Sequence, residues 1–137
     1  MYNDVQKVYD FLKSQYSEII ILGYSMGTGM ASYLAANNPC KSLVLVSPYV
    51  SLVNMKNRFI PFVPNFLLKY QFRTDENLKS VSCPIHLIHG TRDEVIPFDS
   101  SEKLKSLFPQ SKLIKLDGVS HRQIIFNQAV GRVVKAI

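Results

Sequence analysis

The sequence predicts an α/β fold, in which a parallel sheet with flanking helices forms a single domain over residues 1–137. Four short apolar runs, rich in branched side chains, alternate with segments whose apolar residues recur every three or four positions. Strands that alternate with helices in this way form parallel sheets with right-handed crossovers. The chain is 47% hydrophobic and 19% charged, which suits a globular core and excludes a disordered or collagen-like protein.

The first part of the chain predicts a helix, a strand, a second helix and a second strand. Apolar residues at helical spacing over residues 2–16 predict the opening helix. The apolar runs at 19–22 and 43–46 predict strands that are buried on both faces. Between these runs, an apolar stripe predicts a helix that ends at residues 37–39. The stripe consists of Met26, Met30, Tyr33 and Leu34.

The second part predicts two further strands, each followed by a helix. Residues 85–88 and 113–116, each with three apolar residues in four, predict the third and fourth strands. Between them, Asp99 and Glu102 form a capping box that predicts the start of a short helix. The apolar residues of this helix are Leu104, Leu107 and Phe108. Helical spacing predicts a closing helix from Ile125, Ala129, Val133, Val134 and Ile137. An irregular insertion, about residues 48–84, separates the second strand from the third.

The net charge of +6 is unevenly distributed along the chain. No Asp or Glu occurs from Ile19 to Thr74. The basic residues of this stretch are Lys41, Lys56, Arg58, Lys69 and Arg73. Proteins that bind nucleic acid cluster their basic residues on one face and interleave them with aromatic stacking residues. Because the basic residues here are scattered singly through an apolar segment, we expect no nucleic-acid partner.

The sequence shows neither a membrane-spanning segment nor a signal peptide. Its longest apolar runs are much too short to cross a bilayer, and polar residues follow Met1 closely. Cys40 and Cys83 have the spacing of neither a metal site nor a redox motif, so we expect two reduced thiols. Together these features predict a cytoplasmic protein.

A glycine-rich turn, Gly23-Tyr24-Ser25-Met26-Gly27, connects the first predicted strand to the second helix. A turn this tight strains the backbone of its central residue and exposes the Ser25 hydroxyl at the start of a helix. The Met26 N–H would then point to the place where an oxyanion forms. Alternatively, the glycines only allow the strand and the helix to pack closely, and Ser25 caps the helix.

A rival interpretation of the same turn is a nucleotide-binding loop. Gly23, Gly27 and Gly29 have a spacing that resembles the cofactor turn of short-chain dehydrogenases, and Tyr9 and Lys13 form a Y-x-x-x-K pair. In that family, however, the Tyr and Lys follow the glycines. The acid-free stretch also lacks the acidic residue that binds an adenosine ribose. We therefore expect no nicotinamide cofactor.

An acid and a base follow the third and fourth predicted strands. A serine hydroxyl needs a base to remove its proton, and an imidazole acts best when a carboxylate fixes its tautomer. Asp93 and His121 supply these two groups. Because ligands bind beyond the carboxyl ends of parallel strands, we expect both residues to lie near Ser25.

Other interpretations of these loops stay open. Glu94 and Asp117 are rival acids, although Asp117 precedes a glycine as in a turn. Asp93 could instead cap a turn, and the histidine of the last loop could begin a helix. His86 and His89 suggest a metal site with Asp93, but a spacing of three in a strand directs the two rings to opposite faces. We expect no bound metal.

Four sequence blocks resemble the α/β-hydrolase-fold serine hydrolases, in the branch that includes serine aminopeptidase-like enzymes and acyl-protein thioesterases. The blocks are GYSMGTG, SPY, PIHLIHGTRDEVIP and DGVSH, and they follow the family's order over essentially the whole chain. The resemblance implies that Ser25 is the nucleophile, His121 the general acid and base, and Asp93 its orienting acid. It further implies that the Met26 N–H is one oxyanion donor, and it implies no cofactor.

The resemblance covers only the last four strands of a fold that usually has eight. We therefore expect a truncated domain that lacks the loop supplying the second oxyanion N–H, which typically lowers the rate by about 10²–10³. The alternative function is a catalytically impaired fragment that acts as an interaction module or needs a missing N-terminal half. Residues 19–22 would then form an apolar edge strand, for which we expect self-association.

In hydrolases of this fold, a cap over the active site occupies the place of the insertion. We expect Phe59, Phe62 and Phe66 to bind substrate there, with Tyr24 beside the nucleophile, and the segment to contact an anionic membrane surface. Alternatively, these phenylalanines are ordinary core. The resulting prediction is a serine hydrolase that cleaves an ester, thioester or amide of a small-molecule or acylated substrate through an acyl-enzyme intermediate.

Overall fold

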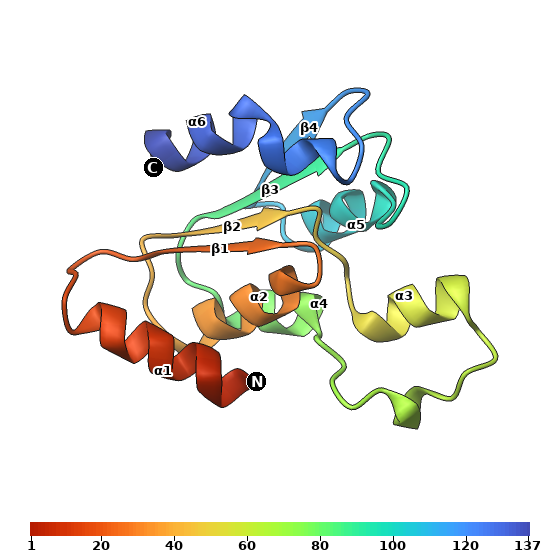
Figure 1. The fold of residues 1–137 in the computed structure, drawn as a ribbon, viewed down its shortest axis with the longest axis horizontal. Coiled ribbons are helices and arrows are strands. Elements are labelled where there is room, and N and C mark those ends of the chain that lie inside the picture. Colours follow the sequence, from red (N-terminus) through yellow and green to blue (C-terminus); the bar gives the residue numbers. More distant parts are fainter.

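A computed structural model describes all 137 residues, which form a four-stranded parallel sheet with helices on both faces (Figure 1). The strands are β1 Ile20–Tyr24, β2 Ser42–Val46, β3 Ile85–Gly90 and β4 Lys112–Leu116. The α-helices are α1 Tyr2–Lys13, α2 Gly27–Asn37, α3 Leu52–Phe59, α4 Thr74–Asn77, α5 Asp99–Leu107 and α6 Gln128–Ala136. Short 3-10 helices are η1 Asn65–Leu67, η2 Leu78–Ser80 and η3 Gln123–Phe126. The predicted fold class and the predicted order of elements are confirmed.

The strands follow one another across the sheet in chain order, β1-β2-β3-β4, and each neighbouring pair is parallel. β2 is buried along its whole length, as its apolar run predicts. β1 lies at the edge of the sheet, and its Leu22 is 46% exposed. The prediction that this strand is buried on both faces is therefore wrong, because the face opposite Ile21 is only partly covered.

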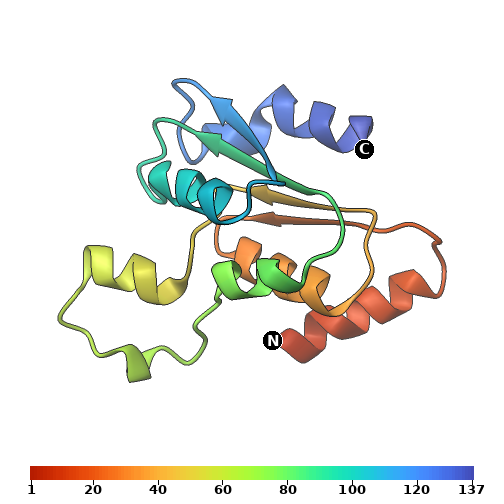
Figure 2. The ribbon, with the colours of Figure 1, turned by 180° about the vertical axis from the view of Figure 1, so that it is seen from behind.

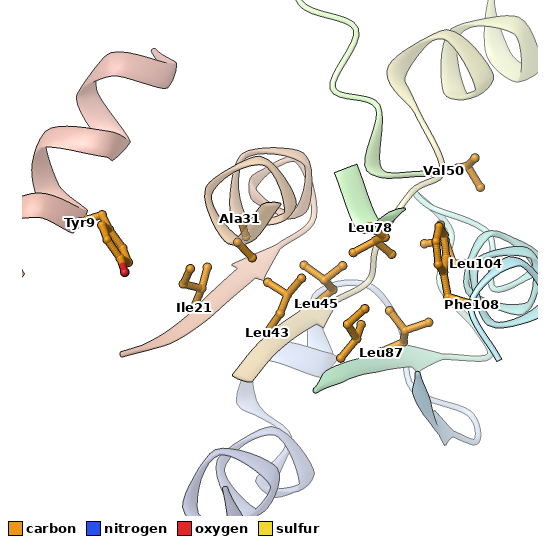
Figure 3. Packing of buried hydrophobic residues seen from close by; sticks show 12 residues of the cluster. Tyr9, Ile21, Ala31, Leu43, Leu45, Val50, Leu78, Leu87, Leu104 and Phe108 are labelled. Carbon is orange, nitrogen blue, oxygen red and sulfur yellow. The ribbon is translucent and has the colours of Figure 1, made fainter. Parts of the chain in front are cut away.

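The two faces of the sheet support separate apolar clusters. Alternate residues of each strand point to opposite faces, so one strand contributes to both clusters. The larger cluster lies under α1, α2 and α5 and includes Ile21, Leu43, Leu45, Leu87 and Leu104 (Figure 3). The smaller cluster lies under η3 and α6 and includes Val44, Val46, Ile88 and Ile124. In Figure 1, α1 and α2 lie on one side of the sheet and α6 on the other.

Three helical predictions are wrong in detail. The buried face of α2 consists of small residues, namely Thr28, Gly29, Ala31, Ser32 and Ala35. Met26, which belongs to the predicted apolar stripe, is exposed instead, because only small side chains fit where α2 packs closely on β1. The capping box of α5 does not form, because Phe98 occupies the N-cap position and Asp99 is already the first residue of the helix, where its carboxylate pairs with Arg58. Ile125 lies in η3, outside α6, and is exposed.

The insertion between β2 and β3 extends beyond the carboxyl ends of the strands (Figures 1 and 2). It contains α3, η1, α4 and η2. Both of its ends are anchored, because Tyr49 and Phe72 are buried together in a third apolar cluster, and Val50 and Leu78 belong to the large one. The insertion is thus attached at its two ends, and its middle projects from the body of the molecule.

Cys40 and Cys83 form a disulfide, with their Cα atoms 6.0 Å apart, so the prediction of two reduced thiols is wrong. Cys40 shortly precedes β2 and Cys83 shortly precedes β3. Because β2 and β3 are parallel neighbours, the residues before them meet at one edge of the sheet. Sequence spacing alone does not show this proximity.

No helix in the structure has both the length and the hydropathy that crossing a membrane requires.

Candidate active site

Ser25 lies in the turn between β1 and α2. Its φ of 53° places it in the left-handed region, which residues with a side chain rarely adopt. The Ser25 N–H donates to the Val46 carbonyl at 2.9 Å and so fixes the turn to β2. A Cβ at Gly23 would lie only 2.7 Å from the Cβ of Ala31 and the carbonyl oxygen of Gly27. Glycine at position 23 therefore permits the close approach of α2 that forms this turn.

Met26 begins the first turn of α2, with its side chain exposed. Its N–H donates to no acceptor within the protein. The peptide is held on its other side, because the buried Tyr49 hydroxyl donates to the Met26 carbonyl at 3.1 Å. A free N–H at the start of a helix, where the helix dipole is positive, suits a developing negative charge.

The structure brings the three predicted residues Ser25, His121 and Asp93 into one hydrogen-bonded chain. His121, from the loop after β4, has its Nε2 3.0 Å from the Ser25 Oγ. Its Nδ1 lies 2.8 Å from Oδ2 of Asp93, which belongs to the loop after β3. Because a carboxylate only accepts, the imidazole proton resides on Nδ1, and Nε2 is free to accept the serine proton. This is the arrangement that a general base for serine requires.

Asp93 is buried and held through both of its carboxylate oxygens. Oδ1 accepts the N–H groups of Val95 and Ile96, at 2.9 and 2.7 Å. Burial by itself raises the pKa of Asp93, but hydrogen bonds from His89, His121 and the Ile96 N–H outweigh burial. The pKa of Asp93 therefore lies well below its ordinary value, and the carboxylate is ionised at neutral pH.

A second imidazole, that of His89, also faces Asp93. Its Nε2 lies 2.8 Å from the Ile96 carbonyl and 3.2 Å from Oδ2 of Asp93, and both of these groups only accept. The proton is therefore on Nε2, and Nδ1 accepts the Ser101 hydroxyl at 2.7 Å. The sequence suggested His89 only as a partner of His86 and Asp93 in a metal site, and it did not predict this hydrogen-bond contact with the acid. The spacing of His89 and Asp93, four residues apart, was the available signal.

The rival acids occupy other positions. Glu94 accepts the backbone N–H of His121 at 3.2 Å and does not contact the imidazole ring. Asp117 is exposed and lies 3.7 Å from Lys115. His86 faces a hollow beside α6, on the face of the sheet opposite His89. No group of three or more His, Cys, Asp or Glu side chains is arranged to hold a metal ion.

The four residues predicted to bind substrate lie in two different places. Tyr24 packs against His121, with the ring centroids 5.2 Å apart. Phe59, Phe62 and Phe66 lie in the insertion and are 56%, 81% and 83% exposed. They are thus not core residues.

Comparison with known proteins identifies the family. The sequence profile of the alpha/beta hydrolase fold family matches residues 1–82. The chain is 30% identical, over 152 aligned positions, to the lysophosphatidylserine lipase ABHD12 of Danio rerio, a match that covers 96% of this chain and 39% of the lipase. An uncharacterized protein of Salmonella typhi, YfhR, is 31% identical over 85% of this chain and 46% of its own length. The chain therefore spans less than half of the length of these relatives.

Solved structures show the same fold. The esterase Est1E from Butyrivibrio proteoclasticus superposes with a TM-score of 0.77 at 19% identity, over 98% of this chain and 66% of the esterase. The esterase domain of a Rhodothermus marinus protein gives a TM-score of 0.76, also at 19% identity, over 99% of this chain and 66% of that domain.

Proposed function

The chain belongs to the α/β-hydrolase family, and on this premise we propose that it is a serine hydrolase acting on an ester, with thioesters and amides as chemically related substrates. The observation that carries the proposal is the chain of two hydrogen bonds from Asp93 through His121 to Ser25. The names of the relatives, a lysophosphatidylserine lipase and esterases, favour an acyl ester over an amide. We propose a lipid or other acylated ester as the substrate class.

In the proposed reaction, His121 Nε2 takes the proton of Ser25 as the hydroxyl oxygen attacks the ester carbonyl. The carboxylate of Asp93 stabilises the imidazolium, and the Met26 N–H donates to the oxyanion of the tetrahedral intermediate. His121 then gives its proton to the leaving oxygen, which departs and leaves an acyl-serine. Water attacks this ester with His121 again as base, and the acid is released when the Ser25 oxygen regains a proton.

Covalent labelling tests the function directly. We expect a fluorophosphonate probe to modify the intact protein, and Ser25→Ala to abolish labelling while the fold is retained. Ser82→Ala, at an exposed serine away from the site, is the matched control and should be labelled like the wild type. A folded wild-type protein that remains unlabelled would contradict the enzyme proposal.

That outcome would support the alternative, a catalytically impaired hydrolase that acts as an interaction module or requires further chain. The partial match to relatives supports this alternative, since the chain covers only 66% of each of the two esterase structures. Met26 supplies one proposed oxyanion donor, and removing one such donor typically lowers the rate by about 10²–10³.

The insertion is proposed to act as a cap that binds apolar substrate and touches a membrane surface. Phe62 and Phe66 are almost fully exposed in the segment that projects beyond the strand ends. Lys69 follows them in the sequence, and no acidic residue occurs from Phe59 to Thr74. Exposed aromatic side chains together with basic charge suit the interface of an anionic bilayer.

Self-association through residues 19–22 is a further proposal. The free edge of β1 and the exposed Leu22 support it, because an apolar edge strand is a template for pairing. We expect a dimer in sedimentation velocity that Leu22→Lys dissociates. A strictly monomeric wild-type protein would contradict this proposal.

The cytoplasmic location likewise stays a prediction. The disulfide between Cys40 and Cys83 favours an oxidising compartment instead, because cytosolic thiols are kept reduced.

A further inference from the structure

Tyr24 connects the strand that carries the nucleophile to the loop that carries the base. Its hydroxyl donates to the backbone carbonyl of His121 at 2.8 Å, across 97 residues of sequence. Its ring also lies against the imidazole, with 5.2 Å between the centroids and 31° between the planes. β1 and β4 are at opposite edges of the sheet, so this contact spans the full width of the site.

The other hydrogen bonds of His121 explain why this contact matters. Its N–H and its Nδ1 are both bound to the loop after β3, by Glu94 and Asp93. Its carbonyl accepts only from Tyr24. Apart from Ser25 itself, Tyr24 is thus the residue that fixes the base relative to the nucleophile's own strand.

The hydroxyl of Tyr24 remains a donor over the working pH range. Burial raises the pKa of Tyr24, and the nearby carboxylates of Asp93 and Glu94 raise it further, while Arg122 acts in the opposite direction with a smaller effect. The net pKa is above the ordinary value, so the hydroxyl keeps its proton at neutral and mildly alkaline pH.

We propose that Tyr24 is a positioning residue, which holds the main chain and the ring plane of His121 so that Nε2 stays aligned with the Ser25 hydroxyl. The proposal rests on the proposed serine hydrolase function and replaces substrate binding as the role of Tyr24. A misplacement of about 1 Å in a reacting group can reduce a rate by about 10². The bond from the Tyr24 hydroxyl and the packing of its ring restrict that movement in two different ways.

Two tyrosine variants form a matched pair. Tyr24→Phe removes the hydroxyl and keeps the ring, whereas Tyr9→Phe removes a similar bond, from a tyrosine hydroxyl to the Pro39 carbonyl, at the opposite end of the sheet. With p-nitrophenyl acetate as substrate, we expect Tyr24→Phe to lower kcat about tenfold with KM unchanged, the effect of about one hydrogen bond. Tyr9→Phe should leave both constants unchanged. Tyr24→Leu, which also removes the ring, should lower kcat about 100-fold.

A rise in KM at constant kcat in Tyr24→Phe would overturn the proposal in favour of substrate binding, and unchanged constants would overturn it as well. The NMR signal of the His121 Nδ1 proton gives a readout that needs no turnover. We expect it to shift or broaden in Tyr24→Phe and not in Tyr9→Phe, and equal spectra would contradict the proposal. If the wild type takes up no fluorophosphonate, the hydrolase function fails, and the same spectra still decide the role of Tyr24.

Discussion

The site around Ser25 and the middle of the insertion are held in opposite ways. Around Ser25, each functional group has at least one hydrogen bond that fixes it, and Asp93 is held through both oxygens. In the insertion, the side chains of Phe62 and Phe66 project from a segment that is buried mainly at its two ends. Polar contacts between loops hold the first region in place, whereas the second region is held only where its two ends pack on the rest of the molecule.

This difference predicts where a substitution has a large effect. A change at the site disturbs several bonds at once, because its members share partners. A change in the middle of the insertion removes little buried surface, so its effect should appear in binding and not in folding. Four sets of variants test where the molecule is sensitive to substitution.

Asp93→Asn should have the largest effect, lowering kcat by about 10⁴ at neutral pH. The asparagine oxygen can still accept the N–H groups of Val95 and Ile96, so the loop should keep its shape. Its NH₂ group would then face the ring protons of His89 and His121 and favour the wrong tautomer of His121. Steady-state kinetics measures the loss, and circular dichroism checks the fold. Activity within tenfold of the wild type would show that Asp93 is not the orienting acid.

Removal of the disulfide should have the next largest effect, on stability. Cys40 and Cys83 are 43 positions apart in the sequence, and the loop that they close includes nearly all of the insertion. Cross-links that close loops of this size typically contribute about 2–4 kcal/mol to the free energy of unfolding. We expect the double variant Cys40→Ser/Cys83→Ser to lose that amount in urea unfolding, and the reduced wild type to match it. Equal stability of oxidised and reduced protein would refute this expectation.

Substitution of the two glycines of the turn should have a smaller effect on stability, and one of the two substitutions serves as a control. A Cβ at Gly23 would lie within 2.8 Å of three atoms of α2, whereas a Cβ at Gly27 would meet nothing within 4 Å. Gly23→Ala should destabilise the protein by about 1–3 kcal/mol through overpacking. Gly27→Ala should be neutral or slightly stabilising, because alanine favours a helix. Equal unfolding midpoints for the two variants would mean that close packing of α2 does not require Gly23.

The smallest effect on stability is expected in the insertion. Phe62→Ser/Phe66→Ser should change the free energy of unfolding by less than about 0.5 kcal/mol, because both side chains are exposed. The affinity of this double variant for vesicles that contain phosphatidylserine should be about tenfold lower than that of the wild type in a sedimentation assay. Phe126→Ser, at a phenylalanine 88% exposed on η3, is the control and should bind like the wild type. Equal binding of all three proteins would contradict the membrane proposal.

The sequence predicts well the features that depend on the pattern of neighbouring residues. Apolar runs located every strand, and the glycine-rich turn located Ser25, because these features depend on neighbouring residues. The order of strands then placed Asp93 and His121 at the same edge of the sheet. Alternation along β3 also placed the rings of His86 and His89 on opposite faces.

The remaining features depend on contacts between distant residues. The disulfide forms because β2 and β3 are neighbours, which the spacing of Cys40 and Cys83 does not show. α5 begins one position earlier than its capping box predicts, so Asp99 lies inside the helix and its carboxylate pairs with Arg58 of α3. The orientation of Tyr24 toward His121 similarly requires the positions of two loops in space.

The left-handed backbone of Ser25 has an evolutionary consequence. Glycine is the residue best suited to such a conformation, so replacement of this serine by glycine would relax the turn and remove the proposed nucleophile in one step. Without selection for catalysis, a change from serine to glycine at position 25 would therefore be tolerated, because it leaves the fold intact. If serine is maintained at this position in descendants of the gene, purifying selection is acting on the chemistry and not on the fold.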